Sequence, residues 1–152
     1  MDFKRRGRSK FRSGDFTIVR PSGRSLDRDR LELLHSGRDY DMRSDGDQIW
    51  LLEGEREVGY AVGAGALWNL VLGERPLTVE QVKPGLAHST VRDDAAIVTE
   101  VRGSGFPLKL VETNGDGGLA DDELAFVVAV ALLGWRESDR AMIAAGSALR
   151  EK

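Results

Sequence analysis

The chain contains no cysteine and only two histidines, His35 and His88, among its 152 residues. The lack of cysteine excludes disulfides, thiolate metal sites and cysteine nucleophiles. The two histidines are isolated in the sequence, and no Gly-x-Ser-x-Gly motif accompanies them. We therefore expect a protein that is not an enzyme. The competing hypothesis is an enzyme with a small-molecule site at the mouth of a barrel, which a deep cleft converging on His35 or His88 would support.

Proline is scarce as well, with 4 residues against 18 glycines, and this balance favours a turn-rich β protein. Hydrophobic residues make up 41% of the chain and charged residues 31%, which is typical of one folded domain. No apolar stretch follows the basic N-terminus, so the sequence predicts no secretory signal. We expect a cytoplasmic location, and peripheral association with a membrane is the second location considered.

Long apolar runs are absent except for one near the C-terminus, Leu124–Trp135. As a helix this run is roughly 18 Å long, which is too short to cross about 30 Å of bilayer hydrocarbon. Asp121, Asp122 and Glu123 precede it and would complement the positive end of a helix dipole. A helix that is apolar all round is a buried helix, so we predict a core helix over about Asp121–Trp135.

Upstream of this helix the chain consists of short apolar or alternating segments separated by turn residues. Asp45-Gly46 is a strong tight-turn signal, and Gly54, Gly73-Glu74 and Asp93-Asp94 mark further hairpins. A single apolar helix after an all-β chain needs strands around it. We therefore predict a mainly β fold, an antiparallel β-barrel that encloses the helix. Four aromatic residues are expected in its core: Trp50, Tyr60, Trp68 and Phe126.

The N-terminal segment is basic. Its first twelve residues hold six cations and one carboxylate, so they carry +5, while the net charge of −3 leaves −8 for the remainder. We predict that residues 1–14 form a disordered arm. Its cations would bind anionic lipid headgroups, each contributing about 1 kcal/mol, with Phe3 and Phe11 inserting at the interface. The predicted headgroup ligands are Lys4, Arg5, Arg6, Arg8, Lys10 and Arg12. Two other roles fit the same residues, contact with nucleic-acid phosphates without sequence specificity and a purely solubilising arm.

The segment before the helix follows the spacing of a twelve-residue calcium loop. Glu112, Asn114, Asp116 and Glu123 occupy ligand positions 1, 3, 5 and 12, and Gly117 occupies position 6. Two features depart from the pattern, because position 1 is Glu rather than Asp and a strand rather than a helix precedes the loop. A glycine-rich turn with acidic helix-start residues explains the same sequence. Calcium is thus a candidate cofactor, and no other cofactor is predicted.

The order of these segments resembles the tubby C-terminal-like superfamily, especially its LURP-one-related and phospholipid scramblase branches. Three stretches carry the resemblance: Arg38–Arg43 with Asp45-Gly46, Ala96–Arg102, and Leu108–Glu112 followed by the acidic loop and Leu124–Trp135. The resemblance implies a barrel of about a dozen antiparallel strands around a hydrophobic helix. It also implies mixed functions, since tubby domains bind phosphoinositides, scramblases act on phospholipids and LURP-one-like proteins have no settled biochemistry. Here a tail follows the helix.

We expect three regions, a basic arm at residues 1–14, a barrel domain at 15–136 and a tail at 137–152 with a weak helix capped by Ser138. The leading hypothesis is a non-enzymatic protein that associates with anionic phospholipids or acts as an adaptor. The alternatives are a protein-interaction module without lipid binding and a calcium-responsive scramblase-like protein. Sequence-specific nucleic-acid binding is not expected.

Overall fold

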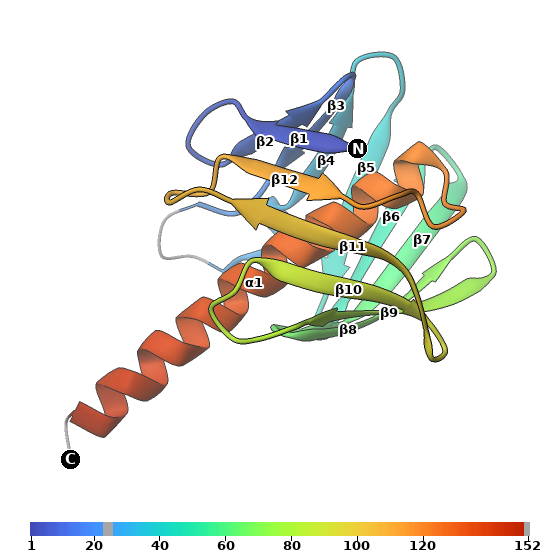
Figure 1. Ribbon diagram of the computed structural model, residues 1–152. Helices are drawn as coiled ribbons and strands as arrows, with labels where there is room; N and C mark the ends of the chain where they lie inside the picture. The colour runs from blue at the N-terminus through green and yellow to red at the C-terminus, as the bar shows by residue number, and fades with distance from the viewer. Residues whose placement is uncertain (23–25, 151–152) are drawn as a thin grey trace.

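The computed structural model describes residues 1–22 and 26–150, with side chains of the last helix described as far as residue 146. Within these residues it contains twelve strands, a short 3-10 helix (η1) and a long α-helix (Figure 1). The elements are β1 (Asp2–Arg5), β2 (Lys10–Ser13), β3 (Phe16–Val19), η1 (Arg28–Arg30), β4 (Glu32–His35), β5 (Tyr40–Asp45), β6 (Gln48–Glu53), β7 (Arg56–Ala64), β8 (Leu67–Leu72), β9 (Arg75–Gln81), β10 (His88–Asp93), β11 (Ala96–Ser104), β12 (Leu110–Thr113) and α1 (Asp121–Arg150).

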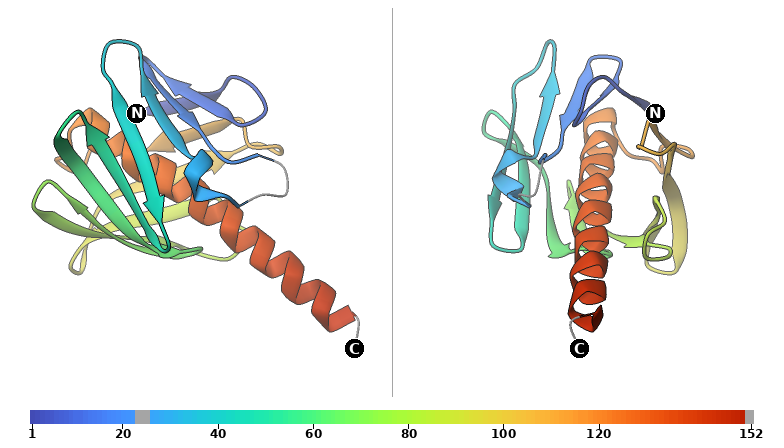
Figure 2. Two further views of the ribbon diagram at one scale, coloured as in Figure 1. Left: turned by 180° about the vertical axis from the view of Figure 1, so that it is seen from behind. Right: turned by 90° about the vertical axis from the view of Figure 1, so that its left-hand side faces the viewer.

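The strands form one antiparallel sheet with the order β4-β3-β2-β1-β12-β11-β10-β9-β8-β7-β6-β5. The first and the last strand of the chain are neighbours in this sheet, because β1 pairs with β12 in a register that places Phe3 opposite Val111. Strands β4 and β5 lie at the two ends of the order, and an isolated bridge between His35 and Arg38 lies in the short turn that connects them. The sheet thus curls into a nearly closed barrel around α1, as Figure 2 shows from two sides. The predicted mainly β fold with a C-terminal helix is confirmed.

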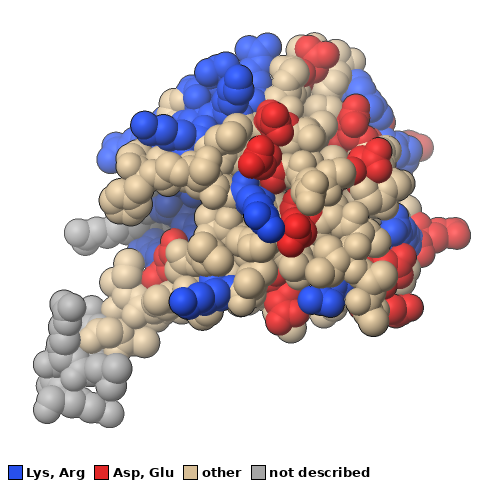
Figure 3. All heavy atoms as spheres, in the orientation of Figure 1, with Lys and Arg blue, Asp and Glu red and all other residues tan. Residues whose placement is uncertain are grey.

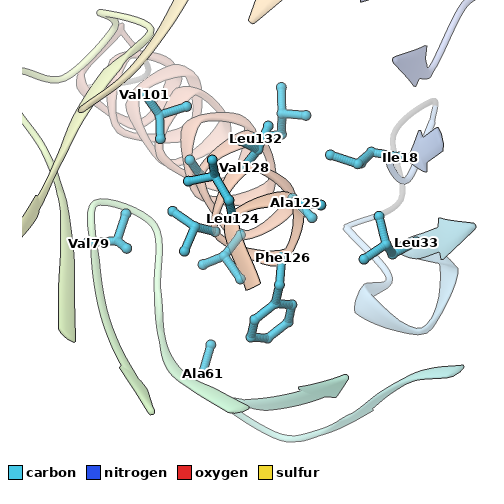
Figure 4. Packing of buried hydrophobic residues seen from close by; sticks show 14 of the residues in the cluster. Ile18, Leu33, Ala61, Val79, Val101, Leu124, Ala125, Phe126, Val128 and Leu132 are labelled. Carbon is cyan, nitrogen blue, oxygen red and sulfur yellow. The ribbon is translucent and has the colours of Figure 1, made fainter. Parts of the chain in front are cut away.

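The core lies between the helix and the inner face of the barrel. Every residue from Leu124 to Trp135 is buried. Figure 4 shows Phe126, Val128 and Leu132 of α1 among side chains from the surrounding strands, including Ile18, Ala61 and Val101. Strands of this kind expose alternate residues, so each contributes one face to the core. The helix itself has no exposed face over this stretch, which explains its uniformly apolar sequence.

The C-terminal tail is not a separate weak helix. Helix α1 continues without interruption from Asp121 to Arg150, a length of roughly 45 Å, and projects out of the barrel (Figure 1). Ser138 therefore lies inside the helix rather than at a cap. Ala and Arg are the commonest residues in the segment after Trp135, and no proline interrupts it, so helix propagation continues beyond the buried part.

The prediction of a disordered arm at residues 1–14 is wrong. Strands β1 and β2 form a hairpin in which Lys4 pairs with Arg12 and Arg5 with Phe11. Phe3 is 0% exposed and Phe11 is 1% exposed, so both are core residues and neither is available to enter a membrane. The charged residues that alternate with them face outward, in the period-two pattern of a half-buried strand.

Trp68 and Phe126 are in the core as predicted, but Trp50 and Tyr60 are only half-buried. In β6 the neighbours of Trp50 point inward, so Trp50 itself points outward. In β7 a register shift places Gly59 opposite Leu51 and Glu57 opposite Leu52, which leaves Val58 as the extra residue of a bulge. The bulge reverses the alternation that the sequence suggests. Ala61 therefore faces the core in place of Tyr60.

Ionic contacts hold the first turn of α1. The carboxylate of Asp122, which is 4% exposed, accepts hydrogen bonds from Arg56 Nη2 at 2.7 Å and Tyr40 Oη at 3.1 Å. Glu53 binds both Arg38 and Arg56, and these hydrogen bonds lower its pKa to about 2. Burial and the nearby Asp122 carboxylate raise the pKa of Tyr40, which stays a neutral donor. The network ties the helix to β5, β6 and β7, and its carboxylates complement the helix dipole.

A second ion pair holds the helix where it leaves the barrel. Arg28 binds Glu137 through two hydrogen bonds of 2.9 Å, and both side chains are largely buried. The guanidinium of Arg28 lies 4.6 Å from the ring centroid of Trp68, and Glu137 also accepts the backbone N–H of Gly65 at 3.0 Å. A bidentate, partly desolvated pair of this kind fixes geometry more strongly than an exposed one. The projecting part of α1 therefore has a defined direction relative to the barrel.

Candidate functional site

The connections between strands gather at two ends of the barrel. We call the end where α1 leaves the barrel the helix-exit end. It contains the β1–β2 turn (residues 6–9), the β9–β10 loop (82–87) and the β11–β12 loop (105–109). Backbone hydrogen bonds join these parts, with Arg5 N–H donating to Lys109 O at 2.8 Å and Arg20 N–H to Ser9 O at 3.0 Å. The β1–β2 turn, the β11–β12 loop and Arg20 thus form one continuous surface.

All six predicted headgroup ligands lie on the β1–β2 hairpin, which the structure makes a rigid carrier. Lys4, Arg6, Arg8, Lys10 and Arg12 are exposed, and Arg5 is half-buried. Lys4 and Arg12 are direct register partners on the outer face, so their charges lie next to each other. Two arginines instead bind their own turns, Arg5 through Gly7 O at 2.9 Å and Arg12 through Gly14 O at 3.0 Å. Arg6 and Arg8 lie in the turn at the helix-exit end.

The hairpin cations have few acidic neighbours. Among the described residues, none of the six is joined to a carboxylate by a salt bridge, whereas Arg28, Arg38, Arg43, Arg56 and Arg75 all are. In Figure 3, Lys and Arg side chains gather at the upper left over this hairpin, and Asp and Glu side chains lie mainly over other parts of the face. Such a single-sign patch attracts anions and raises their local concentration.

Exposed apolar side chains lie at the same end of the barrel as the turn of the basic hairpin (Figure 1). Phe106, in the β11–β12 loop, is 103% exposed, and Val82 and Leu86 in the β9–β10 loop are about half exposed. Sequence reasoning did not single out these residues. The signal was nevertheless present, because an aromatic residue inside the turn sequence Gly103-Ser104-Gly105-Phe106-Pro107 has no core position to fill. Cations next to exposed apolar groups are typical of surfaces that contact a lipid interface.

The structure does not bring the predicted calcium ligands together. Glu112 lies on the outer face of β12, opposite Asp2 and Arg102 in the ladder. Asp116 accepts the N–H of Gly118 at 2.9 Å, and Glu123 accepts the N–H of Ala120 at 2.9 Å. In residues 1–22 and 26–150, no three His, Cys, Asp or Glu side chains form a group that could hold a metal ion. Asn114 follows β12 directly and is exposed. These contacts match the turn-and-cap interpretation of the segment.

The two histidines lie in different parts of the barrel. His35 packs edge-on against Phe16 at 4.6 Å between ring centroids, close to the seam between β4 and β5, and its Nδ1 accepts the N–H of Gly37. His88 lies in β10 with its Nε2 3.1 Å from Glu100, whose pKa this contact lowers. Neither histidine lines the cavity of about 790 Å³ beside the point where α1 leaves the barrel.

No described helix combines the length and the apolar content needed to cross a bilayer. No protein-family model, no curated protein and no solved structure matches the chain.

Proposed function

We propose that this protein is a non-enzymatic module that associates with anionic phospholipid surfaces through its helix-exit end. The observation that carries the proposal is the β1–β2 hairpin, whose six cations lack carboxylate partners among the described residues and whose turn lies at the same end of the barrel as the exposed Phe106. Its architecture also agrees with the resemblance to tubby-like proteins, in which lipid recognition recurs. A protein-interaction module without lipid binding is the alternative.

The rigidity of the hairpin supports this function. A disordered arm loses conformational freedom when it binds, whereas a hairpin held by β12, β3 and the buried Phe3 and Phe11 is already ordered. The turn cations Arg6 and Arg8 would contact headgroups, each contributing about 1 kcal/mol near an anionic surface. Phe106 would enter the boundary between headgroups and acyl chains. Attraction by charge and partial insertion together favour a lipid surface over a purely ionic partner.

Co-sedimentation with vesicles tests the proposal. We expect wild-type protein to bind phosphatidylcholine vesicles that contain phosphatidylserine, in the presence of EDTA, and to be released by salt because surface charges are screened. It should not bind pure phosphatidylcholine. A variant neutralised at four hairpin positions should bind on the order of a thousandfold more weakly, because each lost cation removes about 1 kcal/mol. The four substitutions are Lys4→Gln, Arg6→Gln, Arg8→Gln and Lys10→Gln.

A control variant carries the same change in net charge away from the hairpin. Its substitutions are Arg30→Gln, Arg43→Gln, Arg92→Gln and Arg102→Gln. We expect this control to bind vesicles much like the wild type. Equal losses in both variants would show that net charge alone drives adsorption, and a wild type that stays in the supernatant at low salt would favour the interaction-module alternative.

A further inference from the structure

A cavity of about 790 Å³ opens at the helix-exit end, beside the point where α1 leaves the barrel. Its walls come from α1 after Trp135, from the β9–β10 and β11–β12 loops, and from Arg20. The volume lies within the range of pockets that bind small molecules. None of the six hairpin cations lines it, although Phe106 lies at its edge, so its charged groups are distinct from those of the hairpin.

The polar part of the cavity is cationic. Arg20, Arg136 and Arg140 line it, with Asp139 as the one carboxylate among its described lining residues. The Nε of Arg20 and the Nη1 of Arg140 are shielded from solvent and have no hydrogen-bond partner in the part of the chain that the structure describes. No salt bridge joins either arginine to a carboxylate of the described residues. Donors buried without partners are unfavourable, and an anionic oxygen at this position would satisfy them.

The electrostatic surroundings point the same way. Burial lowers the pKa of Arg20, and the neighbouring Arg136 and Arg5 lower it further. Burial and Arg140 likewise lower the pKa of Arg136. The Asp139 carboxylate acts in the opposite direction and raises the pKa of Arg20. Burial raises the pKa of Asp139 itself, which disfavours the charged form of this carboxylate. The arginines therefore repel one another in a partly desolvated place, and a bound anion would relieve that repulsion.

The rest of the cavity wall is apolar. Leu108, Trp135 and Ile143 line it. The indole N–H of Trp135 donates to Ser89 Oγ at 2.9 Å, so this donor needs no further partner in the cavity. Of the eight large apolar side chains that the described structure leaves exposed, five lie on the elements around this opening: Val82, Leu86, Phe106, Met142 and Ile143. Exposed apolar groups gathered around a cavity mark a binding site.

We propose that this cavity binds one anionic amphiphile, with a phosphate or carboxylate headgroup on Arg20 and Arg140 and an acyl chain against Leu108, Trp135 and Ile143. Guanidinium groups match the geometry of phosphate and carboxylate oxygens. The apolar wall takes a chain that a simple inorganic anion lacks. This chemistry occurs both in membrane phospholipids and in free fatty acids or alkyl phosphates. The inference goes beyond the proposed function, because it concerns other residues and requires no membrane surface.

Calorimetric titration with monomeric dodecyl phosphate tests this site. We expect saturable binding to the wild type, and clearly weaker binding of inorganic phosphate and of dodecyltrimethylammonium, which lack the chain and the negative charge respectively. Arg140→Gln should raise the Kd roughly tenfold, as expected for loss of a charge-assisted hydrogen bond. Ile143→Asn should raise it several-fold. Both residues lie on the projecting part of α1, so neither change threatens the barrel core.

Arg43→Gln, on the outer face of β5, is the matched control and should leave the Kd unchanged. The variant neutralised at Lys4, Arg6, Arg8 and Lys10 should keep its affinity for dodecyl phosphate even where its vesicle binding is lost. Vesicle binding by the Arg140→Gln variant then shows whether membrane lipid also uses the cavity. The proposal is overturned if dodecyl phosphate does not bind, if dodecyltrimethylammonium binds as tightly, or if Arg140→Gln and Arg43→Gln behave alike.

Discussion

Replacing Val128 by aspartate should leave little or no folded protein. Val128 is 0% exposed and lies in the middle of the buried part of α1, among side chains of the barrel wall (Figure 4). A carboxylate at this position would lose its hydration without gaining a cationic partner, since every residue from Leu124 to Trp135 is apolar or glycine. The expected loss in the free energy of unfolding is ~5 kcal/mol, comparable with the total stability of many domains.

The measurement is chemical unfolding followed by circular dichroism, with Ala141→Asp as the control. Ala141 lies on the same helix but is exposed, so the same new charge should change the free energy of unfolding by less than about 1 kcal/mol. A Val128→Asp protein with an unchanged unfolding midpoint would contradict the enclosed helix. Equal losses in both variants would instead show that helix formation, and not burial, limits stability.

Phe11→Ala should cost about 3–5 kcal/mol, as expected for removal of a buried aromatic ring. The ring of Phe11 is 1% exposed, and Arg20 covers it with its guanidinium 5.6 Å from the ring centroid. A disordered arm would predict no change at all for this substitution. The stability of this one variant therefore distinguishes a folded β1–β2 hairpin from a disordered N-terminal arm.

Phe106→Ala is the matched control, because it removes the same ring from a side chain that is 103% exposed. We expect its free energy of unfolding to stay within about 0.5 kcal/mol of the wild type. Vesicle binding by this control should nevertheless weaken, since Phe106 lies at the proposed contact. If Phe11→Ala is as harmless as Phe106→Ala, then β1 and β2 do not belong to the folded barrel.

The barrel was predictable because its central hairpins carry strong local signals. Asp45-Gly46 lies at a tight turn, and Gly46 adopts a φ of 61°, which glycine accepts without strain. The position of the buried helix followed from the single apolar run. The first two strands were missed because each contains one buried residue, Phe3 or Phe11, between charges, and such short alternation resembles a disordered basic tail.

The candidate site could be predicted only in part. Its six hairpin cations were recognised from charge alone, although their conformation was not. Arg20 and Arg140 are far apart in sequence, and nothing local indicates that the end of β3 and the projecting helix line one cavity. The pair of Arg28 and Glu137 is equally invisible in the sequence, because tertiary packing over 109 residues creates it. The bulge at Val58 depends on strand register, which the pattern of β7 does not reveal.

Amide hydrogen exchange, measured with and without phosphatidylserine-containing vesicles, shows whether a rigid basic hairpin at the helix-exit end contacts an anionic lipid surface. In the free protein, amides of β1 and β2 should exchange far more slowly than in an unfolded chain. Vesicles should slow exchange further in residues 6–9 and 105–109, and leave the β8–β9 turn at the opposite end unchanged. Rapid exchange throughout residues 2–13 of the free protein, or vesicle protection at the β8–β9 turn instead, would contradict the account.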